Sequence, residues 1–348
     1  MWYNISMMRK RLTVALLMAA ASAGAVDASN PSSSAARYAT DAYPGFDREE
    51  EIVEPGKKEP RWFSWLNGPA KDSAAEQFAY AQERQADGSW RAARRAYDAL
   101  VREWPTAPEA PKAQLALADM YFEHYLEYAA AFEEYRYLLD YYSMQCDYDT
   151  IAARLYETAK LMREEGKRFL FFRFANTVDV RRAFEAVVLR APGAPYAAEA
   201  MLAVAELRED DLEYDKAIQV YENIRNLHAG TPEAKTALLR EAAARMTLLR
   251  KHEYNRSRCQ DTISFLRLAL AANPDAETRE TFSAYLAEAV ALVEDEAYRA
   301  AKFYDSRTRT KRSAITAYER FLREYPASVH APAALARLTE LQQESNGK

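Results

Sequence analysis

The chain has 348 residues, enough for one long domain or two domains of ordinary size. Only 9 Gly and 14 Pro occur, and alternating runs of β-branched residues are scarce, which favours helix and argues against a sheet fold. With 47 Lys and Arg against 52 Asp and Glu, the formal charge is −5. No nucleic-acid partner is expected, since proteins that bind nucleic acid usually carry a basic stripe.

Residues 1–25 predict a secretory signal peptide. A basic stretch at residues 9–11 precedes an apolar run at residues 12–21, which is too short to span a bilayer. Small residues then offer cleavage after Ala25 or Ala28. An uncleaved membrane anchor is the alternative. No cysteine lies directly after the apolar run, where a bacterial lipoprotein carries its lipid, so no lipid anchor is visible in the sequence.

Residues 26–72 predict a disordered tether that ends in a cluster of aromatic residues. The stretch is rich in Ser, Pro and charged residues, a composition that buries too little apolar surface to fold. Its aromatic cluster at residues 61–66, the aromatic knot, is expected to cap the first helix pair of the domain that follows. The alternative is an anchor for a partner or for a membrane interface, where Trp is favoured. The candidate partner-binding residues of the aromatic knot are Trp62, Phe63 and Trp65.

Residues 73–345 repeat one pattern. The stretch AYDALVREWPTAPEAPKAQLALADM begins at Ala96, and the similar stretch AYERFLREYPASVHAPAALARLTEL begins at Ala317. In each, an aromatic residue is followed eight positions later by Pro, which stops a helix. Six segments share this aromatic residue, at Tyr97, Tyr135, Phe184, Tyr221, Phe265 and Tyr318. Phe265 is irregular, because Pro274 follows it one residue late.

A second regularity lies just upstream of these aromatic residues. Trp90, Ala93 and Tyr97 are spaced i, i+3 and i+7, so one helical face carries an aromatic, a small and a second aromatic residue. The same spacing recurs at Tyr128, Ala131 and Tyr135, and at Tyr214, Ala217 and Tyr221. Gly88 precedes Trp90 by two positions, where a turn between paired helices needs a permissive backbone.

These features are those of the tetratricopeptide repeat: a helix, a turn, a helix with Ala and an aromatic residue, and then Pro. We therefore predict an all-α fold, a right-handed superhelical solenoid of about six tetratricopeptide helix pairs. A capping helix near residues 333–343 is expected to close it, because the last helix of a solenoid needs one polar side. An unrelated helical bundle is the alternative.

An insertion in the third pair does not fit the repeat. Residues 167–174 read KRFLFFRF, in which four Phe are flanked by cations. We expect this segment to extend the preceding helix and to pack within the superhelix. The alternative is that Phe171 and Phe172 are presented to a partner, since exposed apolar patches usually mark binding sites.

No reaction machinery is visible in the sequence. Phosphate-binding, nucleophile-elbow and zinc-protease motifs are missing, and the four His are scattered, so neither a cofactor nor a metal is expected. Cys146 and Cys259 lie about three repeats apart, which favours two unpaired thiols. A solenoid instead offers a groove lined by the first helix of each pair, in which aromatic residues and Arg are favoured anchors. The groove candidates are Phe78, Tyr80, Arg84, Tyr121, Tyr125, Tyr156 and Arg208, with core packing as the alternative for each.

With its repeats laid out, the chain resembles the BamD family, tetratricopeptide lipoproteins of the outer-membrane β-barrel assembly machine. The resemblance covers residues 73–345 and begins with the pattern from Tyr97 to Pro105. It continues in the Phe-containing insertion and Arg-Ala-Phe of residues 171–201 and in the ending at residues 301–341. The missing lipid-accepting Cys and a solenoid longer than is usual in the family are departures.

The resemblance implies a non-enzymatic periplasmic scaffold, peripheral at the inner face of the outer membrane. Such a scaffold binds the barrel-inserting subunit and unfolded barrel proteins. A generic periplasmic tetratricopeptide adaptor in cell-wall or polysaccharide export complexes is the alternative, and the missing lipid site favours it. An enzyme supported by the solenoid would need a catalytic domain, for which no residues are left over.

Overall fold

The computed structural model describes residues 43–46, 68–168, 173–251, 254–272, 274–307 and 311–346. Within these ranges all regular structure is helical, with thirteen α-helices and one π-helical segment. In chain order they are α3 (Ala74–Ala86), α4 (Trp90–Glu103), α5 (Ala110–Asp119), η2 (Met120–Tyr125), α6 (Tyr128–Tyr141), α7 (Tyr148–Arg168), α8 (Arg173–Arg190), α9 (Ala197–Asp210), α10 (Tyr214–Leu227), α11 (Pro232–Lys251), α12 (Arg256–Ala271), α13 (Ala276–Arg307), α14 (Lys311–Glu324) and α15 (Ala331–Asn346).

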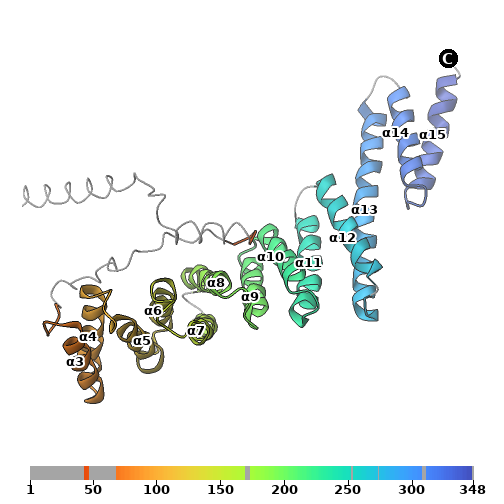
Figure 1. Ribbon diagram of the computed structural model, residues 1–348. Helices are drawn as coiled ribbons and strands as arrows, with labels where there is room; N and C mark the ends of the chain where they lie inside the picture. Colours follow the sequence, from red (N-terminus) through yellow and green to blue (C-terminus); the bar gives the residue numbers. More distant parts are fainter. Residues whose placement is uncertain are drawn as a thin grey trace, which may run out of the picture.

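The helices form six consecutive pairs. Each helix packs against the next one along the chain, and the pairs stack into an elongated array that runs from α3 to α15 (Figure 1). The pairs are α3/α4, α5/α6, α7/α8, α9/α10, α11/α12 and α13/α14, and α15 closes the array. The prediction of an all-α tetratricopeptide solenoid with six helix pairs and a terminal helix is confirmed.

The repeated aromatic residues fix the second helix of each pair. Five of them, Tyr97, Tyr135, Phe184, Tyr221 and Tyr318, are at most 2 % exposed. The small residues Ala93, Ala131 and Ala217, one turn earlier, are 0 % exposed, so the neighbouring helix lies close at these points. Helix packing at short range explains why these positions hold Ala rather than a larger side chain.

The structure corrects the prediction that Phe265 is the buried aromatic residue of the fifth pair. Phe265 is only half-buried, whereas its neighbour Leu266 is 0 % exposed. Pro274 follows Leu266 by eight residues, so Leu266 occupies the place of Tyr97 in this pair. Thr262, one turn before Leu266, is 1 % exposed and takes the place of the small Ala. Phe265 is therefore displaced from the core to its edge.

The two similar stretches of sequence fold alike. After α4, the Ala107 amide donates to the Trp104 carbonyl oxygen at 3.1 Å. After α14, the Ser328 amide donates to the Tyr325 carbonyl oxygen at 3.2 Å. In both places Pro lies two residues beyond the last helical residue, and a new helix begins five residues after it. The Pro signal therefore ends the second helix, as predicted.

In the first, second and fourth pairs the turn between the two helices contains a left-handed residue. Gly88 has φ 72°, and the equivalent positions in the second and fourth pairs are Leu126 with φ 54° and Leu212 with φ 63°. Each of the three precedes the first residue of a second helix by two positions. A side chain in this region costs about 1–2 kcal/mol, which the packing of the paired helices must offset at both leucines.

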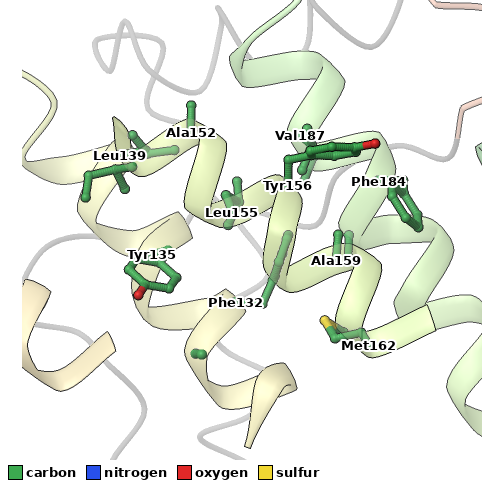
Figure 2. Close-up of a cluster of buried hydrophobic side chains, with 14 of the residues drawn as sticks. Phe132, Tyr135, Leu139, Ala152, Leu155, Tyr156, Ala159, Met162, Phe184 and Val187 are labelled. Carbon is green, nitrogen blue, oxygen red and sulfur yellow. The ribbon is translucent and has the colours of Figure 1, made fainter. Parts of the chain in front are cut away.

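The buried core is continuous in the first part of the solenoid and divided in the second. One cluster of buried side chains extends from Ala81 on α3 to Ala237 on α11. Figure 2 shows the part of this core where side chains of α6, α7 and α8 meet. A separate cluster surrounds Leu266 of α12, and another surrounds Tyr318 of α14.

The terminal helix has one buried side. Ala334, Leu338 and Leu341 of α15 are at most 7 % exposed, and most of the residues between them face solvent. The Arg337 guanidinium also bonds the Asp305 carboxylate of α13 at 2.7 and 3.1 Å. This pattern fits the predicted capping role, in which the last helix presents a polar outer side.

Candidate protein-binding surfaces

The groove candidates divide into buried and half-buried residues. Tyr121, Tyr156 and Arg208 are 2, 8 and 0 % exposed, which favours the core-packing alternative for these three. The half-buried candidates are Phe78, Tyr80, Arg84 and Tyr125. Phe78 also packs inward, because its ring centroid lies 5.8 Å from that of Tyr97. Tyr80, Arg84 and Tyr125 remain as surface candidates.

Tyr80 and Arg84 interact directly on α3. The Arg84 guanidinium lies 5.3 Å from the centre of the Tyr80 ring, and the Lys71 ammonium lies 5.7 Å from the same centre. Arg84 also pairs with Glu83 at 2.9 Å. The first helix thus presents an aromatic ring between two cations, an arrangement held by cation–π attraction.

A second patch, the Trp90 patch, joins the first two pairs and consists of Trp90, Arg94, His124 and Tyr125, with the buried Tyr121 ring beneath them. The Arg94 guanidinium lies 5.8 and 5.6 Å from the ring centres of Tyr121 and Tyr125. Trp90 stacks on His124 with centroids 4.0 Å apart. Trp and Arg side chains of this kind are common anchors of protein interfaces.

The π-helical segment η2 positions the Trp90 patch. One more residue separates Ala118 from Ala131 than separates Ala81 from Ala93, although all four are equally buried. The helix accommodates this extra residue by widening over Met120–Tyr125. π-Helical turns are rare and often occur at functional sites. The sequence analysis did not predict the π-helical segment, although the extra residue between Ala118 and Ala131 is visible in the sequence.

Arg208 is the centre of a buried network of charged residues. Its guanidinium bonds Glu185 of α8 at 2.9 Å and Glu213, which precedes α10, at 2.5 Å. Arg181 of α8 lies 3.8 Å from Glu185 and bonds Asp211 at 2.6 Å. The network ties the third pair to the fourth, which explains why an Arg occupies a fully buried place.

A large hollow lies in the fifth pair. It has a volume of about 1200 Å³ and is lined by the end of α10, by α11 and by α12. Leu268 of α12 lies on its wall and is 73 % exposed, and Leu239 of α11, also on the wall, is 36 % exposed. The hollow sits where the continuous core ends, and binding sites often lie at such junctions.

Phe265 is held on the wall of this hollow by two cations. The guanidinium groups of Arg225 and Arg245 lie 5.3 and 4.8 Å from its ring centre. Both arginines also bond Glu241, at 2.7 Å for Arg225 and at 2.7 and 2.8 Å for Arg245. Glu241 is 0 % exposed, and burial raises its pKa against the opposing effect of the two arginines. The ring is thereby fixed in orientation.

Several sequence predictions lie outside the described residues. These are the signal peptide at residues 1–25 and the partner-binding candidates Trp62, Phe63, Trp65, Phe171 and Phe172. Within the described ranges no helix is long and apolar enough to cross a membrane. Over the same part of the chain, no group of three potential metal-ligating side chains lies together. Cys146 and Cys259 are both free thiols.

No protein-family model matches the chain. No curated protein matches it either. Among solved structures, a tetratricopeptide repeat protein from Parabacteroides merdae is 14% identical with a TM-score of 0.27, over 77% of this chain and 98% of that one. PilW, described as a type IV pilus biogenesis factor, is 16% identical with a TM-score of 0.23, over 76% and 100%. The pilF protein of Pseudomonas aeruginosa is 14% identical with a TM-score of 0.24, over 76% and 97%.

Similarity this distant carries no argument about function, because one fold serves many functions. The class of the protein follows from its own helix pairs, their buried Ala and aromatic positions and their recurring turns. They define a tetratricopeptide-repeat solenoid, an architecture that presents extended surfaces to protein partners.

Proposed function

We propose that the chain is a non-enzymatic scaffold of the bacterial cell envelope, similar to the BamD family, that binds the barrel-inserting subunit of a β-barrel assembly machine. The observation that carries the proposal is the agreement between repeat order and resemblance. The three segments that resemble the family's first, third and last repeats lie at α4 and the turn after it, at α8 to α9 and at α13 to α15. Location in the periplasm at the outer membrane is part of this proposal, as is binding of unfolded barrel proteins.

The hollow of the fifth pair is the proposed docking place for a segment of the barrel-inserting subunit. It combines an exposed apolar wall at Leu268 with a ring fixed by two arginines at Phe265. Aromatic residues and Arg are the side chains that most often carry binding energy at protein interfaces. The Trp90 patch offers similar chemistry at the amino-terminal end.

Affinity purification of the tagged chain from gently cross-linked envelopes, followed by mass spectrometry, tests the proposal. Two variants form a matched pair: Leu268→Asp on the hollow and Leu335→Asp on α15, where Leu335 is 57 % exposed. We expect the wild type and Leu335→Asp to enrich a barrel-assembly subunit, and Leu268→Asp to lose most of it.

Other outcomes separate the alternatives. Enrichment of cell-wall or polysaccharide-export proteins without an assembly subunit would contradict the scaffold role and favour the generic envelope adaptor. Equal enrichment by both variants would move the docking place away from the hollow and leave the scaffold role standing.

A further inference from the structure

A short turn within the predicted tether lies on the fourth helix pair, so these four residues are ordered, in contrast to the disorder expected for residues 26–72. In residues 43–46, Tyr-Pro-Gly-Phe, the Phe46 amide donates to the Tyr43 carbonyl oxygen at 3.2 Å. Pro in the second place and Gly45 with φ +92° in the third are the preferred residues of a type II turn. The turn is drawn in orange-red beside α10 in Figure 1.

The turn makes polar and apolar contacts with α10. The Asn223 side-chain amide donates to the Pro44 carbonyl oxygen at 3.0 Å, across 179 positions of sequence. The rings of Tyr43 and Phe46 stack with centroids 5.3 Å apart and an interplanar angle of 19°. Both rings are half-buried against the continuous core, and burial raises the pKa of Tyr43. The two aromatic residues therefore act as one apolar unit seated on the solenoid.

The fit depends on Gly45. A Cβ atom there would lie 2.7 Å from the Lys216 carbonyl oxygen and 2.9 Å from Cγ2 of Val220. Helix backbone cannot move to relieve such contacts, and the positive φ independently favours glycine. At four other glycines, Gly68, Gly88, Gly193 and Gly230, an added Cβ would have no atom within 4 Å. The close backbone approach at Gly45 thus contrasts with the open space at these four glycines.

The contact residues share one helical face. Lys216, Val220 and Asn223 are spaced i, i+4 and i+7, and we call this face the α10 slot. We propose that the α10 slot is a peptide-recognition site for an aromatic-Pro-Gly-aromatic turn, and that the chain's own Tyr43–Phe46 fills it in cis. The occupant is assigned to the same chain because the structure seats the chain's own turn there, with the Asn223 side-chain amide bonded to the Pro44 carbonyl oxygen.

Peptide binding to the full-length chain tests this site. The probe is a fluorescein-labelled synthetic peptide of residues 39–50, measured by fluorescence anisotropy. In the Gly45→Ala variant the chain's own turn no longer fits, so the slot is open. We expect the probe to bind this variant about tenfold or more tighter than the wild type, whose slot is filled. Gly68→Ala, which adds a Cβ in open space, is expected to behave as the wild type.

Two further measurements complete the test. Asn223→Asp places a carboxylate against the Pro44 carbonyl, so adding it to Gly45→Ala is expected to abolish probe binding. In hydrogen exchange, the Phe46 amide is expected to exchange about tenfold or more faster in Gly45→Ala and in Asn223→Asp than in the wild type. Equal probe binding to wild type and Gly45→Ala, or binding to neither, would overturn the proposal. Phe46 protection that falls on dilution would show that a second copy fills the slot, which would overturn occupancy in cis.

Discussion

The first four helix pairs and the last two use the same repeat but pack differently. From α3 to the start of α11 the buried side chains form one core, whereas α12 and α14 each have a cluster of their own. The first helices of the last two pairs, α11 and α13, have 20 and 32 residues, but their partners α12 and α14 have 16 and 14. Where a helix extends beyond its shorter partner, its overhanging turns are less buried.

The aromatic and Pro signals thus make helix pairs, whereas matched helix lengths make a continuous core. The change in packing affects one place of functional interest. The hollow with Phe265 lies at α11, where one kind of packing gives way to the other. We infer that the chain unfolds as two cooperative units joined through α11, as expected when neighbour contacts weaken in a repeat array.

Removal of Arg208 is expected to have the largest effect. Arg208→Ala leaves Glu185 buried at 3 % exposure without its ion pair at 2.9 Å, which costs about 3–5 kcal/mol in the first unit. Arg299→Ala is the matched control, because that side chain is 67 % exposed and its loss costs within about 0.5 kcal/mol. Urea unfolding measures both. A loss below about 1 kcal/mol for Arg208→Ala would show that the network does not bind the third pair to the fourth.

The register of the fifth pair comes next. Leu266→Ala removes a fully buried side chain and is expected to cost about 2–5 kcal/mol in the second unit. Phe265→Ala is expected to cost less than half as much, since Phe265 lies at the edge of the core. Thermal unfolding of the two variants decides the matter. A larger loss of stability for Phe265→Ala than for Leu266→Ala would show that Phe265, and not Leu266, occupies the core position.

Two buried tyrosines, one in each unit, allow a direct comparison of how strongly their hydroxyl groups are bonded. The Tyr135 hydroxyl donates to the Asp119 carboxylate at 2.6 Å, and Tyr135→Phe is expected to cost about 1–3 kcal/mol. The Tyr318 hydroxyl lies 3.4 Å from Asp305, which Arg337 already bonds, so Tyr318→Phe is expected to cost about 0.5 kcal/mol. Chemical denaturation of both variants checks the difference. Equal costs would contradict the view that the first unit is the more tightly bonded one.

Low pH is expected to weaken the packing of the terminal helix α15, and this is the smallest of the expected effects. The Arg337 guanidinium lowers the pKa of Asp305 below its ordinary value of 3.8. The pair therefore stabilises the fold above that value, and the gain is lost as the pH falls through the lowered pKa. We expect the hydrogen-exchange protection of α15 to fall below about pH 4. Asp305→Asn should remove this pH dependence, and an unchanged profile in that variant would exclude the Asp305 carboxylate as its cause.

Much of the fold was predictable because its signals are local. Aromatic spacing and Pro lie within one helix and its following turn, so a single sequence displays them. The register of the fifth pair was also accessible, since counting back eight residues from Pro274 reaches Leu266 rather than Phe265. Phe265 is bulky and aromatic and lies next to the true core position, so it resembles the repeated aromatic residue.

The surfaces were less predictable because they join distant residues. Arg208 resembles any exposed Arg near a helix end until Glu185 and Glu213 are brought to it from two other elements. The contact of Pro44 with Asn223 depends on a close approach that no local pattern encodes. The hollow follows from a mismatch in helix lengths, and helix ends are the least certain feature of a sequence-based prediction.

The division into two units can be tested with the natural probes of the chain. Trp90 and Trp104 begin and follow α4 in the first unit, and no Trp lies beyond position 104. The change in Trp90 and Trp104 fluorescence therefore reports the first unit, whereas far-UV circular dichroism reports helices in both. In a urea titration we expect the dichroism to fall first, as the second unit unfolds, and the fluorescence to change at higher urea. Two separate transitions would support the account. A single transition with coincident fluorescence and dichroism curves would contradict it and make the solenoid one cooperative body.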